Sequence, residues 1–160
     1  MVSLEPLPAD DPRAVALLTE YFDLRAETFP GQYRPVFPER ATFDPPAGLF
    51  LVVADDDGTD VGCGGIRRIP DGDTGIRYEV KHLYLTPRTR GRGWGRLLLN
   101  ALEDQARKWQ AAELVLDTHH TLEAAGNLYA RSGFTAIEAY NENPNATRWY
   151  GKPLVGGPSD

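Results

Sequence analysis

Residues 80–109 contain three segments in a row: an apolar run, a glycine- and arginine-rich segment, and a run with helical periodicity. Residues 80–85 predict a buried strand, and residues 96–109 predict a helix with one apolar stripe. The glycines between them leave backbone N–H groups uncovered, and the first turn of a helix adds unpaired donors and the positive end of its dipole. This unit predicts an α/β fold with a phosphate site at the start of a helix.

The charge around the turn also favours an anionic ligand. The whole chain carries a net charge of −6, yet residues 81–95 contain no acid, and four arginines surround the turn: Arg88, Arg90, Arg92 and Arg96. An acidic chain that concentrates arginine at one helix start is expected to bind a polyanion there. A surface loop with arginines by chance is the alternative. The negative net charge argues against general nucleic-acid binding.

Three classes of phosphate-binding loop are considered for this segment. A nucleotide-hydrolysing loop requires lysine and then serine or threonine after its last glycine, whereas Arg96 and Leu97 follow Gly95. A dinucleotide-binding loop requires Gly-x-Gly-x-x-Gly early in its domain, whereas these glycines are spaced two apart and come late. The sequence therefore disfavours both of these classes. The third class is a loop that binds coenzyme A.

The segment resembles the coenzyme A loop of the GNAT superfamily, the GCN5-related N-acetyltransferases, whose pattern is Arg/Gln-x-x-Gly-x-Gly/Ala. Arg90, Gly93 and Gly95 match this pattern. Residues 78–87 resemble the family's fourth strand, and residues 128–134 resemble its Leu-Tyr-x-Lys/Arg-x-Gly-Phe signature. The clear resemblance covers residues 61–134, and residues 140–154 are similar to a bacterial subgroup of small-molecule acetyltransferases.

The pattern along the chain predicts a single domain of mixed α/β class. The expected order is a strand, one or two helices, three strands, a helix, a strand, a helix and two strands. This order is also the GNAT arrangement, a mixed and mostly antiparallel sheet of six to seven strands flanked by about four helices. We expect an acetyltransferase domain over residues 1–154 and a frayed tail over residues 155–160.

The resemblance implies an enzyme that transfers an acetyl group from acetyl-CoA to a primary amine of a small molecule, by direct transfer in a ternary complex. It implies that the loop binds the pyrophosphate, and that backbone groups of the fourth strand hold the pantetheine arm and polarise the thioester carbonyl. The cofactor-binding residues expected on this basis are Leu83, Leu85, Arg90, Gly91, Arg92, Gly93, Trp94 and Gly95.

Two side chains are the expected catalytic residues. Tyr129 aligns with the family's tyrosine, whose hydroxyl can donate a proton to the departing thiolate; a ring packed on the core is the alternative. Glu79 occupies a position where several relatives have a general base. A surface acid paired with Lys81 or Arg77 on the same face of the strand is the alternative for Glu79.

The acceptor is expected between the loop after the first helix and the last strands, where aromatic and polar residues gather. The expected acceptor-binding residues are Arg25, Phe29, Tyr33, Asn141 and Tyr150. Arg25, together with Arg34, could bind a carboxylate, which would suit an amino acid or its analogue. One departure from the family is Leu122, which stands where many relatives have an asparagine that contacts the coenzyme.

No metal is expected, because adjacent His119 and His120 point in different directions and lack further ligands. The single cysteine, Cys63, and the absence of a signal-like or membrane-length apolar run favour the cytoplasm, with no membrane partner. A non-catalytic acyl-CoA-binding sensor and a nucleotide-binding domain are the rival functions. The residues do not decide between a monomer and a homodimer, and they do not identify the acceptor.

Overall fold

The structure is a computed structural model that describes residues 1–154, so the expected tail lies outside the described residues. Within this range it contains three α-helices, α1 (Pro12–Thr28), α2 (Trp94–Lys108) and α3 (Glu123–Arg131), and two short 3-10 helices, η1 (Arg40–Phe43) and η2 (Pro87–Thr89). The strands are β1 (Ser3–Pro6), β2 (Gly48–Ala54), β3 (Asp60–Gly72), β4 (Gly75–Leu85), β5 (Glu113–Thr118), β6 (Thr135–Ala136) and β7 (Arg148–Pro153).

The seven strands form one sheet in the order β1-β2-β3-β4-β5-β7-β6. Only the β4–β5 pair is parallel, so the expected mixed and mostly antiparallel sheet is confirmed. About four helices were expected, and three α-helices are present in the described part of the chain. Between α1 and β2, five prolines over residues 30–46 leave only η1, because proline lacks the backbone donor that a helix interior needs.

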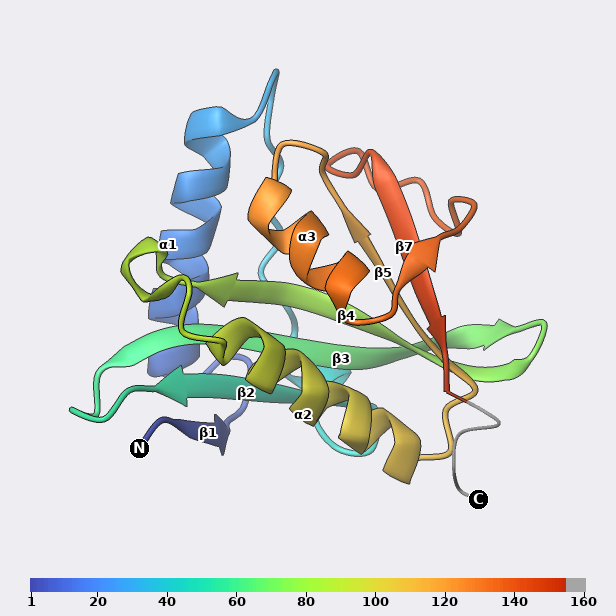
Figure 1. Cartoon of the computed structure of the whole chain (residues 1–160), viewed down its shortest axis with the longest axis horizontal. Coiled ribbons are helices and arrows are strands. Elements are labelled where there is room, and N and C mark those ends of the chain that lie inside the picture. Colours follow the sequence, from blue (N-terminus) through green and yellow to red (C-terminus); the bar gives the residue numbers. More distant parts are fainter. Residues whose placement is uncertain (155–160) are drawn as a thin grey trace.

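The helices cover both faces of the sheet (Figure 1). α1 begins at Asp11, whose side chain accepts a hydrogen bond from the Arg13 N–H, and Pro12 opens the first turn. α1 packs Leu18 and Phe22 on one face of β2 and β3, while α2 packs Leu98 and Leu102 on the other. The sheet is therefore the middle layer of three, with a hydrophobic cluster on each side.

The parallel strands β4 and β5 separate part-way along their length. Their pairing ends at Val80 and Leu116, although both strands continue beyond that point. β4 carries one extra residue there: His82 and Leu83 lie opposite the single Gly64 of β3, and His82 has a φ of 58°. Such a bulge bends the strand. Figure 1 shows the two strands diverging, which leaves the end of β4 without a partner on that side.

None of the helices in residues 1–154 combines the length and the apolar character needed to cross a membrane.

Candidate active site

A cavity of about 1340 Å³ occupies the gap between the diverging strands. Its walls come from β4, β5, α1 and α3, from the start of α2, and from two loops at residues 33–39 and 141–145. The segments expected to bind coenzyme and the segments expected to bind an acceptor therefore line one continuous space.

The glycine-rich loop forms one end of this cavity. Gly93 is the N-terminal capping residue of α2 and has a φ of 80°, and Gly91 has a φ of 85°. Residues with a Cβ adopt this left-handed conformation at an energetic cost, which explains glycine at both positions. The first-turn N–H groups of α2 lie at this end of the cavity and lack carbonyl partners within the helix.

Seven of the eight expected coenzyme residues line the cavity: Leu83, Leu85, Arg90, Gly91, Gly93, Trp94 and Gly95. Arg92 does not line it, because its guanidinium lies over the Trp94 ring, 5.3 Å from the ring centroid. Arg96 lines the cavity in addition. The loop therefore offers backbone donors and two arginines, Arg90 and Arg96, to an anion at the helix start.

Tyr129 lies on α3 and lines the middle of the site. The side chain is 5% exposed, and its ring packs against Phe134 and Tyr150. Burial raises the pKa of the Tyr129 phenol well above its usual value, and the hydroxyl of tyrosine is protonated at neutral pH even without this shift. A protonated phenol is the form that can donate to a thiolate.

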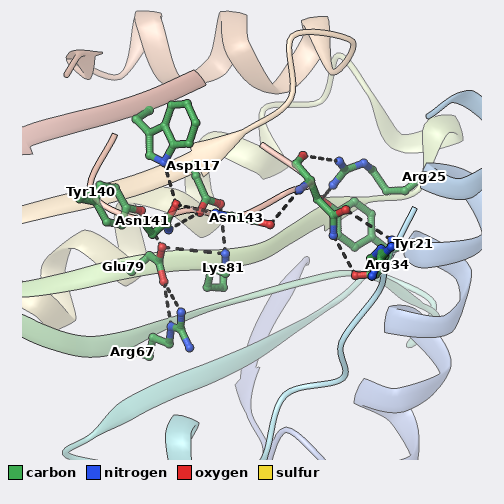
Figure 2. Close-up of polar contacts among 12 residues, drawn as sticks. Tyr21, Arg25, Arg34, Arg67, Glu79, Lys81, Asp117, Tyr140, Asn141 and Asn143 are labelled. Atoms are coloured by element: carbon green, nitrogen blue, oxygen red, sulfur yellow. Dashed lines mark hydrogen bonds and ion pairs between the residues drawn. The ribbon is translucent and has the colours of Figure 1, made fainter. Parts of the chain in front are cut away.

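Glu79 is enclosed below the cavity rather than exposed in it. It is fully buried and does not belong to the cavity lining. Arg67 donates to one carboxylate oxygen at 2.8 Å, and the Tyr140 hydroxyl donates to the other at 2.6 Å (Figure 2). The expected alternative partners were Lys81 and Arg77; Lys81 lies 3.9 Å away and Arg67 takes the closer position. The geometry therefore gives Glu79 no direct contact with a bound amine.

A second acid and a lysine, neither of them among the expected site residues, do line the cavity. Lys81 Nζ lies 3.1 Å from Asp117 Oδ1, and Asn141 Nδ2 donates to Asp117 Oδ2 at 2.7 Å (Figure 2). Burial alone would raise the pKa of Asp117, but the charge of Lys81 and the hydrogen bonds from Asn141 and Lys81 outweigh it and leave that pKa below its ordinary value.

The strand register explains why this pair meets. Lys81 and Asp117 directly follow Val80 and Leu116, the last residues of β4 and β5 that pair with each other. Side chains just beyond the last paired residues of two parallel neighbouring strands are expected to meet where the strands separate. The register was needed to recognise this, and single-strand patterns do not provide it.

Of the expected acceptor residues, Arg25, Tyr33 and Asn141 line the cavity, whereas Phe29 and Tyr150 do not. Phe29 ends α1 and packs its ring on His119 and Tyr33. Tyr150 lies on β7, where its ring faces Tyr129. Both rings therefore pack against residues that line the cavity, Tyr33 and Tyr129, without lining it themselves.

Arg25 is a buried cation without an acidic partner in the described part of the chain. It is 9% exposed, and no carboxylate of residues 1–154 lies within 4 Å of its guanidinium. Its neighbours are the rings of Tyr21, Phe29 and Tyr33, with the guanidinium carbon 4.9 Å from the Tyr33 centroid. Aromatic faces attract a cation but do not neutralise its charge.

Within residues 1–154, no group of three or more histidine, cysteine, aspartate or glutamate side chains is arranged to hold a metal ion. The side chains of His119 and His120 were expected to point in different directions, but their rings stack on each other, with centroids 4.4 Å apart. His119 Nδ1 lies 2.7 Å from the Thr121 hydroxyl. Cys63 is buried within β3.

The fold and the loop define a class of coenzyme-binding transferase domain. The family model for "Acetyltransferase (GNAT) family" matches residues 17–134, well over half of the chain. The chain therefore belongs to the GNAT family, whose members use acetyl-CoA.

Two relatives support this membership. The chain is 38% identical over 102 residues to an uncharacterised N-acetyltransferase of Schizosaccharomyces pombe, and 39% identical over 86 residues to an IAA acetyltransferase of Azospirillum brasilense. The matches cover 64% and 54% of this chain, and they span 61% and 54% of the relatives' own lengths.

Solved structures agree with the fold over nearly the whole chain. A Klebsiella pneumoniae protein, provisionally named an acyl-CoA N-acyltransferase, matches with a TM-score of 0.75 and 28% identity over 96% of this chain and 98% of its own. An acetyltransferase of Streptococcus agalactiae matches with a TM-score of 0.74 over 96% and 98% of the two chains, and at 20% identity it is evidence for the fold alone.

Proposed function

We propose that the protein is an acetyl-CoA-dependent N-acetyltransferase whose acceptor is a small primary amine that carries a carboxylate, such as an amino acid or its analogue. Family membership supports the acetyl donor and the reaction class. The observation that carries the acceptor class is Arg25, a buried cation on the cavity wall without a carboxylate partner in residues 1–154. Burying a charge without a counter-ion is costly, and an acceptor carboxylate would supply that counter-ion.

The proposed reaction is a direct attack within a ternary complex. The neutral amine nitrogen bonds to the thioester carbonyl carbon, and the resulting oxyanion accepts a hydrogen bond from the backbone N–H of Leu85. The carbon–sulfur bond then breaks, Tyr129 donates its proton to the thiolate, and solvent reprotonates the phenolate. The products are the N-acetylated acceptor and coenzyme A, and the proton of the attacking nitrogen leaves to a base.

Glu79 stays our proposal for that base, acting through an intermediary. Its carboxylate is separated from the cavity, and the nearest cavity-lining amine is Lys81 Nζ at 3.9 Å. A water molecule or Lys81 would therefore have to carry the proton from the acceptor to Glu79. Asp117 also lines the cavity, and its carboxylate lies 3.1 Å from Lys81 Nζ, next to this proposed route for the proton.

The acceptor class is tested by pairing amino acids with the amines left after decarboxylation. We expect thiol release with the amino acids, and we expect Arg25→Ala to raise their KM about tenfold or more while leaving acetyl-CoA affinity unchanged, since a charged hydrogen bond contributes about 1.5–3 kcal/mol. Arg148→Ala is the matched control, because Arg148 is exposed and does not line the cavity.

Equal rates with an amino acid and its decarboxylated amine would contradict the role of Arg25. Acetyl-CoA binding with no thiol release across a broad amine panel would instead favour the rival function, a non-catalytic acyl-CoA sensor.

A further inference from the structure

Three asparagines alternate along the segment that joins β6 to β7, and they form a continuous path of hydrogen bonds. Asn141 Oδ1 accepts from the backbone N–H of Asn143 at 3.2 Å and from the Trp149 indole at 2.9 Å. Asn143 Oδ1 accepts in turn from the backbone N–H of Asn145 at 2.9 Å. Because Asn141 also donates to Asp117 on β5, Asn145 is anchored to the sheet.

Asn145 then contacts the loop on the opposite side of the cavity. Its Nδ2 donates to the backbone carbonyl of Arg34 at 2.8 Å, and its Oδ1 accepts from the backbone N–H of Arg34 at 3.4 Å. Its own backbone carbonyl accepts from Arg25 Nη2 at 3.4 Å. Figure 2 shows this path running from Asp117 through Asn141 and Asn143 towards Arg25 and Arg34.

The contact matters because it supplies the hydrogen bonds of the loop backbone, whereas the rings of Tyr33 and Phe37 hold the loop by packing on Phe22. In the described part of the chain, the backbone of residues 30–38 makes no other hydrogen bond, either to backbone or to a side chain. The loop nevertheless supplies Tyr33, whose ring lies against the Arg25 guanidinium, and Val36 and Phe37, which line the cavity and are 75% and 46% exposed. One side-chain amide therefore joins the two loops that face each other across the acceptor side.

We propose that Asn145 is a positioning residue: it fastens the 30–38 loop over the acceptor side of the cavity and thereby holds Tyr33 and Arg25 in place for the acceptor carboxylate. The part of this inference that concerns the acceptor depends on the proposed function, whereas the part that concerns the loop does not. Without the Asn145 amide the loop loses both of its backbone hydrogen bonds, Tyr33 moves away from Arg25, and the guanidinium gains rotational freedom. The acceptor then pays more entropy on binding, which raises KM more than it changes kcat.

The loop is tested first, without any acceptor. Chymotrypsin should cleave between Tyr33 and Arg34, the peptide group next to the contact, and hydrogen exchange at the Arg34 amide reports the contact directly. We expect Asn145→Ala to speed both about tenfold relative to the unmodified protein. Asn145→Asp keeps the acceptor oxygen but loses the donor to the Arg34 carbonyl. Its rates of cleavage and exchange should lie between those of Asn145→Ala and those of the unmodified protein. Asn100→Ala on the exposed side of α2 is the matched control and should match the unmodified protein.

The second arm measures steady-state kinetics with carboxylate-bearing amines that support thiol release. Asn145→Ala should raise their KM about tenfold while kcat changes less than about threefold and acetyl-CoA affinity stays the same. Unchanged proteolysis and exchange in a folded Asn145→Ala protein would overturn the proposal. Faster proteolysis with unchanged KM would overturn its acceptor part. If no carboxylate-bearing amine reacts, the proposed function fails, while the proteolysis and exchange data still decide the role of the contact with Arg34.

Discussion

At the scale of single residues, Tyr129 combines burial with access to the cavity. Its surroundings are mainly apolar, and burial raises the pKa of its phenol, which favours the protonated form but also makes the phenol a weaker acid. An exposed tyrosine would also be protonated at neutral pH. The proposed acid role therefore depends on where the fold places the hydroxyl, on the cavity wall, rather than on the pKa shift.

Tyr129→Phe separates this acid role from a packing role, since it removes only the hydroxyl. We expect kcat to fall about 100-fold or more, in line with the usual contribution of general acid catalysis, while the Kd for acetyl-CoA stays nearly unchanged. Steady-state kinetics provide kcat, and a binding titration provides the Kd for acetyl-CoA. Equal loss of turnover and of coenzyme affinity would mean that the hydroxyl binds coenzyme rather than donating a proton.

Glu79 illustrates how far a position along a strand can predict a role. Its place on β4 favoured a base, but the structure surrounds its carboxylate with Arg67 and Tyr140, from a neighbouring strand and from a loop 61 residues away. Only the register of β3 against β4 brings Arg67 opposite Glu79. Lys81, two residues further along, is a charged residue of this strand that does line the cavity.

At the scale of elements, the start of α2 is the part of the site most completely predicted from sequence. The turn, the helix start and the two positive-φ glycines all depend on residues within a few positions of one another. An added Cβ at Gly93 would meet no atom within 4 Å, so glycine is required there by its backbone conformation rather than by lack of space.

Comparing Gly93→Asp with Gly93→Asn tests the anion site at this helix start. Both residues tolerate a positive φ better than other non-glycine residues, and they have nearly the same shape, so they differ mainly in charge. We expect the aspartate variant to lose acetyl-CoA affinity about tenfold or more beyond the asparagine variant, because its carboxylate faces the pyrophosphate position. Similar affinities in a calorimetric titration would place the pyrophosphate elsewhere.

The divergence of β4 from β5 is an element-scale feature that the strand pattern does not reveal. The pattern of residues 80–85 would suit a regular strand, whereas the structure has a bulge at His82 within it. A bulge arises from pairing between strands, and apolar periodicity within one strand carries little information about it. The cavity between the two strands is a consequence of that pairing.

At the scale of the whole molecule, His82 both lines the cavity and affects the stability of the fold. Its ring packs against Phe22 and Phe43 from the α1 side of the sheet. Burial, and secondarily the charges of Lys81 and Arg67, lower the pKa of His82 to about 3. The folded state therefore prefers the neutral imidazole.

This pKa predicts a loss of stability in mild acid. Between pH 6.5 and 3 the unfolded state binds a proton at His82 that the folded state does not, so the free energy of unfolding falls as pH decreases, by up to about 1.4 kcal/mol per pH unit. The loss from His82 levels off below its folded pKa. His82→Asn keeps a residue that tolerates the positive φ and should remove this slope.

Urea unfolding of the unmodified protein and of His82→Asn across this pH range measures the difference between their free energies of unfolding. The contributions of the other titrating groups largely cancel in that difference. Parallel pH profiles for the two proteins would mean that His82 is protonated in the folded state at the same pH as in the unfolded state.

The sequence by itself determined the local features of this protein: the cap of α1 at Asp11, the glycine turn before α2 and the alternation of strands and helices. These depend on interactions among residues that are close along the chain. The tertiary structure decided which charges meet, since Lys81 and Asp117 are 36 residues apart and Arg34 and Asn145 are 111 apart. Strand register and loop packing bring such residues together, and both are properties of the complete fold rather than of any short segment.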